Sequence, residues 1–109
     1  MAIGSNKRLL LELDKHRSDV NKKTINTCIG DLNLDKLRPI VDMVAKSRAA
    51  YACELMTLSM NQTDAGPSAE QIEQLRDRRL EFSELVKATN ALEVIIERGY
   101  VDIIEVLTS

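Results

Sequence analysis

Apolar residues recur at helical spacing along most of the chain, and most regularly between residues 35 and 98. Steps of four and three residues connect a first stripe: Leu37, Val41, Val44, Arg48, Tyr51, Leu55 and Leu58. The same period connects a second stripe: Ile72, Leu75, Arg79, Phe82, Val86, Thr89, Glu93 and Ile96, widened by Leu85, Leu92 and Ile95. A repeat of about 3.5 residues on both segments predicts two long helices that pack antiparallel at a shallow angle.

A turn separates these two helices at residues 61–67, with the sequence Asn-Gln-Thr-Asp-Ala-Gly-Pro. Gly66 tolerates a positive φ, while Pro67 fixes its own φ and has no N–H to donate. Ser68 is followed three residues later by Gln71, which is the pattern of a capping box. We therefore expect a long helical hairpin, made of residues 35–62 and 68–98.

A first helix is indicated upstream, with Ser5 or Asn6 as its cap and Gly30 at its end. Its apolar stripe is weak in the middle, because Val20 is the only apolar residue between positions 17 and 23. The stripe contains Leu9, Leu13, His16, Val20, Thr24 and Cys28.

The start of the second helix has two interpretations. With Asn33 as the cap, Pro39 lies too deep in the helix to spare its N–H. Either a short turn at residues 34–37 kinks into the main helix, or Asp35 is the cap and Pro39 lies at the edge of the first turn.

The segment after the third helix follows Gly99, a natural C′ residue. The spacing of Tyr100, Ile103, Ile104 and Leu107 predicts a short amphipathic helix and not a strand. This helix either continues the third one through Gly99 or turns back over the bundle.

The composition agrees with an all-α fold, since four glycines and two prolines are too few for the turns of an all-β chain. We expect one domain, residues 1–109: an antiparallel helical bundle with an N-terminal helix, the hairpin and a short C-terminal helix. Residues 1–5 and 108–109 are expected to be frayed.

Membrane insertion and disulfide formation are not favoured. The longest apolar run, Ala49–Cys53, is too short to span a bilayer. Cys28 and Cys53 are the only cysteines, and both lie on predicted apolar helix faces. We expect two buried thiols in a reducing cytoplasm, with a disulfide between them as the alternative.

Enzymatic constellations are not evident in the sequence. His16 is the only histidine, and Glu12 lies one helical turn before it. We interpret them as a surface pair, with a small inter-subunit active site as the least favoured alternative. No C-x-x-C, Gly-rich phosphate loop or Gly-x-Ser-x-Gly turn occurs. We expect no catalytic residues, no metal and no cofactor.

The second helix has more apolar surface than one neighbouring helix can cover. Between Ala49 and Met60 the only charged residue is Glu54. We expect an uncovered patch that binds a protein partner or a second copy of the chain, formed by Ala49, Ala52, Cys53, Met56 and Met60. The favoured function is thus a non-enzymatic protein-interaction module, such as an adaptor, chaperone or regulator, present as a homodimer.

Nucleic-acid binding is the alternative function, through six basic residues of the first helix: Lys7, Arg8, Lys15, Arg17, Lys22 and Lys23. The net charge of −2 argues against it, because dedicated nucleic-acid binders are usually strongly basic.

Arg48 and Thr89 are two of the polar residues that occupy apolar positions of the hairpin. We expect Arg48 to emerge at a helix edge or to pair with an acidic residue, because burying an unpaired guanidinium is costly.

Overall fold

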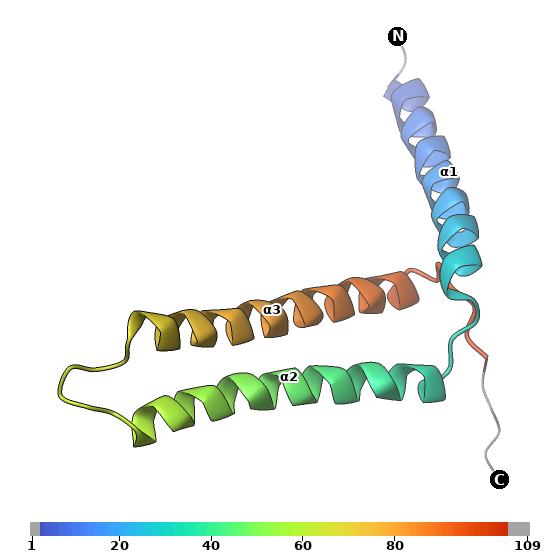
Figure 1. Cartoon of the computed structure of the whole chain (residues 1–109). Helices are drawn as coiled ribbons and strands as arrows, with labels where there is room; N and C mark the ends of the chain where they lie inside the picture. Colours follow the sequence, from blue (N-terminus) through green and yellow to red (C-terminus); the bar gives the residue numbers. More distant parts are fainter. Residues whose placement is uncertain (1–2, 105–109) are drawn as a thin grey trace. The chain divides into compact units, whose positions relative to one another are not determined.

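Three α-helices make up most of the chain in the computed structural model, which describes residues 3–104 (Figure 1). They are α1 (Ile3–Ile29), α2 (Leu34–Met60) and α3 (Ala69–Glu97). The prediction of an all-helical chain is confirmed for these residues, which contain no strand beyond one isolated β-bridge. The chain divides into two compact units, one formed by Asp35–Leu92 and the other by the residues before and after it. The bundle packing expected for α1 stays a prediction.

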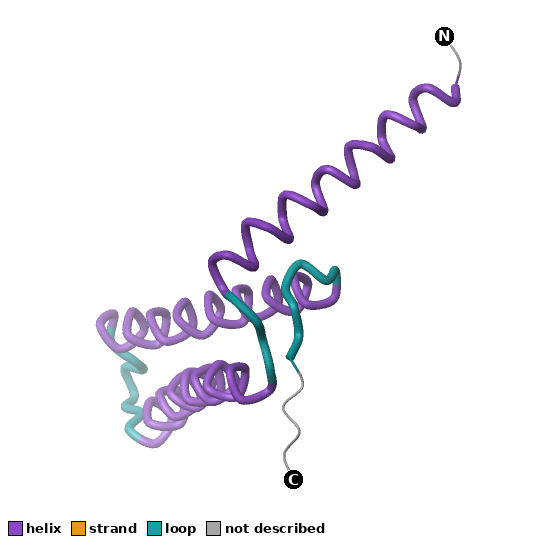
Figure 2. The backbone as a smooth tube through the Cα atoms, turned by 90° about the vertical axis from the view of Figure 1, so that its right-hand side faces the viewer, coloured by secondary structure: helices purple, strands orange, loops and turns teal. Residues whose placement is uncertain are grey.

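The helical hairpin is confirmed. Helices α2 and α3 lie side by side with opposite directions, and the turn after Met60 joins them at one end (Figures 1 and 2). Gly66 has a φ of +76°, and its N–H donates to the carbonyl oxygen of Thr63 at 2.9 Å. The left-handed conformation that the turn requires is therefore at the expected glycine.

The capping box at the start of α3 is also confirmed. The backbone N–H of Ser68 donates to Gln71 Oε1 at 2.8 Å, and the N–H of Gln71 donates to Ser68 Oγ at 3.2 Å. The two side chains thus satisfy backbone donors that the first turn of a helix otherwise leaves without partners.

Replacing Ser68 with alanine is expected to lower the free energy of unfolding by about 1 kcal/mol, because the Gln71 N–H loses its acceptor. Chemical denaturation followed by circular dichroism measures this change. Ser59→Ala is the matched control, since Ser59 is exposed within α2 and takes no part in the two capping hydrogen bonds. An unchanged midpoint for Ser68→Ala would contradict the energetic role of the cap.

The stripe by which α2 packs is shifted relative to the predicted one. Leu37, Val44, Tyr51 and Leu58 are half-buried as expected, but Val41 and Leu55 are 64% and 56% exposed. The residues that are covered in place of Val41, Arg48 and Leu55 each lie one position earlier in the sequence. Ile40 and Glu54 are half-buried, and Ser47 is buried. Every second residue of the predicted α2 stripe, namely Val41, Arg48 and Leu55, was therefore wrongly assigned to the contact with α3. Ser47 in place of Arg48 keeps the guanidinium out of the contact.

The stripe of α3 agrees with the prediction more closely. Its half-buried residues are Leu75, Phe82, Ser83, Leu85, Val86, Thr89, Leu92, Ile95 and Ile96. Ile72, Arg79 and Glu93 were expected in this stripe but are exposed, Ile72 by 50%. Thr89 satisfies its hydroxyl locally by donating to the carbonyl oxygen of Leu85 at 2.7 Å. The Thr89 hydroxyl therefore needs no polar partner on another helix, although the residue lies in the apolar stripe.

The starts of α1 and α2 differ from the expected ones. Helix α1 already includes Ser5 and Asn6, so neither residue is its cap. Helix α2 begins at Leu34, directly after Asn33, and continues through Pro39 as one element. Asp35 as the cap is therefore wrong. Proline removes only one intrahelical hydrogen bond at this position, and the helix extends beyond it for several turns.

Helix α3 ends at Glu97, and Gly99 stops it instead of bending it, which resolves the alternative left open by the sequence. Gly99 has a φ of +73°, its N–H donates to the carbonyl oxygen of Ile96, and that of Tyr100 donates to the carbonyl oxygen of Ile95. This pair of bonds is a Schellman motif, which stops a helix.

The short C-terminal helix is a wrong prediction as far as the structure describes the segment. Residues 100–104 are not helical, and Ile103 forms a parallel β-bridge with Leu32. The Leu32 N–H donates to the Asp102 carbonyl oxygen at 2.9 Å, and the Ile104 N–H donates to that of Leu32 at 2.8 Å. Pairing with an extended partner therefore supplies the bonds that a helix would have made internally. Leu107 lies outside the described residues.

This pairing is part of the unit formed by the two ends of the chain. Leu32 and Val101 are only 5% and 4% exposed. Asn26 Nδ2 donates to Asp102 Oδ2 at 3.3 Å, and the Asp102 N–H donates back to Asn26 Oδ1 at 3.2 Å. Hydrogen bonds from Arg98 and Asn21 lower the pKa of Tyr100. The C-terminal segment is thus attached to the last turns of α1 by polar contacts around a small apolar centre.

Candidate functional site

The apolar patch expected on α2 is exposed. Ala49, Ala52 and Cys53 are all exposed, and Met56 and Met60 are 59% and 81% exposed. Leu55, which the sequence had assigned to the contact with α3, is exposed beside them. We call these six residues the α2 patch. Their accessibility is what a binding surface requires, and their role in binding stays a prediction.

The hairpin that carries this patch has hardly any core. The buried apolar residues of the described chain are Leu32 and Val101, and neither belongs to Asp35–Leu92. Within that unit Ser47 alone is buried, and every apolar side chain of the two facing stripes keeps some contact with solvent. Two helices in contact along one line leave the flanks of that line open.

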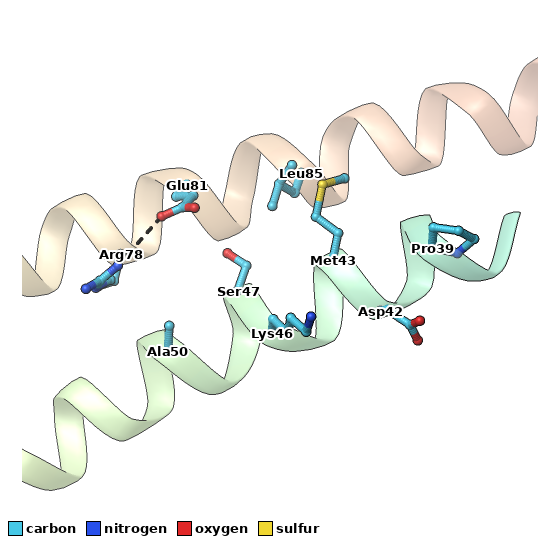
Figure 3. A pocket seen from close by; sticks show the side chains of 9 residues that line it. All are labelled: Pro39, Asp42, Met43, Lys46, Ser47, Ala50, Arg78, Glu81 and Leu85. Atoms are coloured by element: carbon cyan, nitrogen blue, oxygen red, sulfur yellow. Dashed lines mark ion pairs between the residues drawn. The ribbon is translucent and has the colours of Figure 1, made fainter. Parts of the chain in front are cut away.

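One flank forms a groove of about 450 Å³ between α2 and α3, shown in Figure 3. Met43 and Ser47 point from α2 toward α3, where Leu85 lies opposite (Figure 3). The charged residues of this groove balance: Asp42 and Glu81 accompany Lys46 and Arg78. Arg78 Nη1 lies 4.0 Å from Glu81 Oε2. We call this the balanced groove.

A second groove of about 470 Å³ lies between the same helices and has a different lining: Arg48, Tyr51, Arg79, Phe82, Ser83, Val86 and Lys87. The guanidinium carbon of Arg48 is 5.2 Å from the centroid of the Phe82 ring, a cation–π distance. The rings of Tyr51 and Phe82 are 6.3 Å apart and tilted by 36°. Three of the seven residues are cationic and none is acidic, so we call this the cationic groove.

Arg48 emerges at the helix edge, which was one of its two expected environments. It is exposed and stacks on Phe82 instead of entering the α2–α3 contact. The sequence also showed Arg79 at an apolar position of the other helix. The cationic groove itself was missed, because only the pairing register of the hairpin shows that Arg48, Arg79 and Lys87 line one flank.

The six basic residues of α1 are exposed, but they do not form a uniform basic face. Arg17 Nη1 lies 2.7 Å from Asp14 Oδ1, Arg8 Nε 3.9 Å from Glu12 Oε1, and Lys22 Nζ 3.8 Å from Asp102 Oδ1. The remaining residues of this set are Lys7, Lys15 and Lys23. Half of the proposed phosphate contacts are thus engaged with carboxylates, which weakens the nucleic-acid alternative.

The cysteines correct another expectation. Both Cys28 and Cys53 are exposed and free, whereas buried thiols were predicted. The apolar stripe of α1 and the predicted frame of α2 had placed them toward a core. In the structure Cys53 lies two positions after Tyr51, outside the half-buried stripe of α2.

Glu12 and His16 are both exposed on α1. Among the described residues, no three acidic, histidine or cysteine side chains gather closely enough to hold a metal ion. Nor does any helix of residues 3–104 combine the length and apolar character needed to cross a membrane.

The fold and surfaces define an all-helical chain with a helical hairpin at its centre. Comparison with protein families, curated proteins and solved structures gave no match.

Proposed function

We propose that this protein is a non-enzymatic interaction module that self-associates through the α2 patch. In the proposed homodimer, two hairpins pack α2 against α2 and complete an antiparallel helical bundle. One observation carries the proposal: the hairpin has no buried apolar side chain, while its helix α2 exposes an apolar patch.

Energetic considerations favour a covered hairpin. Ordering the backbone costs about 1–2 kcal/mol per residue, and apolar burial returns about 25 cal/mol per Å². Two helices with open flanks bury too little apolar surface to offset this entropic cost by a wide margin, as is typical of small units with thin cores. Covering Leu55, Met56 and Met60 would recover part of the deficit.

A second copy suits the patch because of its residue types. Alanines at positions 49 and 52 let another helix approach closely, and an isologous contact buries the same patch twice. Glu54 is the only charged residue between Ala49 and Met60, and it lies in the half-buried stripe that faces α3. When two copies pack through the α2 patch, the contact therefore brings together no like-charged side chains from residues 49–60.

Helix α1 offers a poorer match of residue types. Between Arg17 and Lys23 its only apolar residue is Val20, which itself is 45% exposed. The central turns of α1 could therefore contribute little apolar surface to a cover for α2. The cytoplasm is the compartment proposed for this module, because thiols such as those of Cys28 and Cys53 stay reduced there.

Size-exclusion chromatography with light scattering tests the dimer. The wild type is expected to be dimeric at micromolar concentration, and Ala49→Glu is expected to weaken dimerisation by about a hundredfold, because a carboxylate would be buried in the contact. Ala91→Glu is the matched control, since Ala91 is exposed on α3 and outside the patch. This variant should remain dimeric.

Two results would overturn the proposal. A wild type that is monomeric at high micromolar concentration would exclude the homodimer. An Ala49→Glu variant that is both folded and fully dimeric would show that the contact lies elsewhere. Circular dichroism of each variant establishes that it is folded before its mass is interpreted.

A further inference from the structure

The cationic groove has a charge excess that the hairpin does not neutralise. Arg48, Arg79 and Lys87 line it, although the chain as a whole has a net charge of −2. Within residues 3–104, neither Arg79 nor Lys87 has an ion pair, and the contact of Arg48 is with the Phe82 ring. Like charges on one groove repel each other, so this arrangement is stabilised when an anion binds.

The balanced groove provides an internal comparison. It lies between the same helices and has nearly the same volume, but two carboxylates accompany its two cations. The contrast depends on neighbouring residues: Arg78 lines the balanced groove beside Glu81, and Arg79 lines the cationic one. The charge excess is therefore a property of one flank and not of the hairpin as a whole.

The cationic groove also has an aromatic wall. Tyr51 from α2 and Phe82 from α3 are in contact, and Arg48 lies over the Phe82 ring. Phe82 and Tyr51 are two of the three aromatic residues of the chain, which contains one Phe, two Tyr and no Trp. Ser83, half-buried in the lining, adds a hydroxyl donor. Guanidinium groups and hydroxyls are the donors that carboxylates and phosphates favour.

We propose that the cationic groove binds a small aromatic anion. Its carboxylate or phosphate accepts hydrogen bonds from Arg79 and Lys87, and its ring packs against Tyr51 and Phe82. A volume of about 470 Å³ lies in the range of small-molecule sites, which is about 300–1,000 Å³. The site combines an apolar wall with a few polar groups, as such sites usually do.

Phenyl phosphate is the probe, titrated into the full-length ¹⁵N-labelled protein and followed by NMR chemical shifts. Saturable shifts are expected at the backbone amides of residues that line the cationic groove. Inorganic phosphate, which lacks the ring, and benzyl alcohol, which lacks the charge, should each bind at least about tenfold more weakly.

Matched substitutions separate this site from general electrostatics. Arg79→Gln is expected to weaken phenyl phosphate binding about tenfold, whereas Arg78→Gln removes the same charge from the adjacent residue and should leave binding unchanged within about twofold. Lys87→Gln and Lys46→Gln form a second pair of the same kind. None of these four side chains is buried, so the variants should fold.

Several outcomes would overturn the proposal. Equal losses for Arg78→Gln and Arg79→Gln would mean that only net charge matters. Equal affinity for inorganic phosphate would exclude a role for the aromatic wall, and the absence of saturable shifts would exclude the site. An acidic peptide that binds this groove where phenyl phosphate does not would assign it to a protein partner. Phenyl phosphate binding is measured by NMR titration and dimerisation by light scattering, so a failure of this proposal is distinguishable from a failure of the proposed function on which it does not rest.

Discussion

Val101→Asp is expected to destabilise the unit formed by the chain ends by about 3–5 kcal/mol, because it places an unpaired carboxylate at a side chain that is only 4% exposed. Amide hydrogen exchange measures the effect locally. The N–H groups of Leu32 and Ile104, which are bonded across the bridge, should lose their protection.

Ile103→Asp is the matched control for this substitution. Ile103 is 53% exposed although it forms the β-bridge, so its change should cost less than about 1 kcal/mol. The comparison of Val101→Asp with Ile103→Asp also discriminates between an extended and a helical conformation of residues 100–104. A C-terminal helix with Ile103 facing a core would make Ile103→Asp the more damaging change, and that ranking would contradict the extended segment.

Ser47→Glu is expected to lower the stability of the hairpin by about 3 kcal/mol, since it introduces both volume and charge at the one buried position of α2. Chemical denaturation of the full-length protein measures the change. The loss should appear as an earlier transition with the helical content of the native state retained at zero denaturant.

Lys46→Glu controls for the new carboxylate, because Lys46 is exposed and precedes Ser47. Its stability should stay within about 0.5 kcal/mol of the wild type, which is usual for surface substitutions. A larger loss for Lys46→Glu than for Ser47→Glu would contradict the α2 stripe, which passes through Ile40, Ser47 and Glu54.

The hairpin was predictable from the sequence because the turn and capping signals agreed with the helical period of the apolar residues. The turn residues, the Ser68–Gln71 capping box and Gly99 each specify a backbone geometry that depends on neighbours in the sequence. These features fixed the end of α2, the start of α3 and the end of α3 to within a few residues.

The frame of α2 was not predictable from hydrophobicity, because two stripes share Leu37, Val44, Tyr51 and Leu58. The intermediate positions are either Val41, Arg48 and Leu55 or Ile40, Ser47 and Glu54, and the first set contains more apolar residues. The structure uses the second set. Polarity alone favoured the wrong frame, since it does not weigh the size of Arg48 in a close helix contact against the small side chain of Ser47.

The extended C-terminal segment was missed for a different reason. Tyr100, Ile103 and Ile104 have helical spacing, but their conformation depends on Leu32, a partner far away in the sequence. Pairwise spacing within a short segment carries no information on such a partner. The cationic groove was missed likewise, because its lining combines residues of two helices.

The contacts between the chain ends have a kinetic consequence. Asn26 and Asp102 are 76 positions apart, so closing this contact in an unfolded chain carries a large entropic cost. Once α2 and α3 have paired, the ends of that hairpin are already near each other, and only short segments remain to be closed. The bridge between Leu32 and Ile103 should therefore form last during folding and open first during unfolding, with the hairpin as the nucleus.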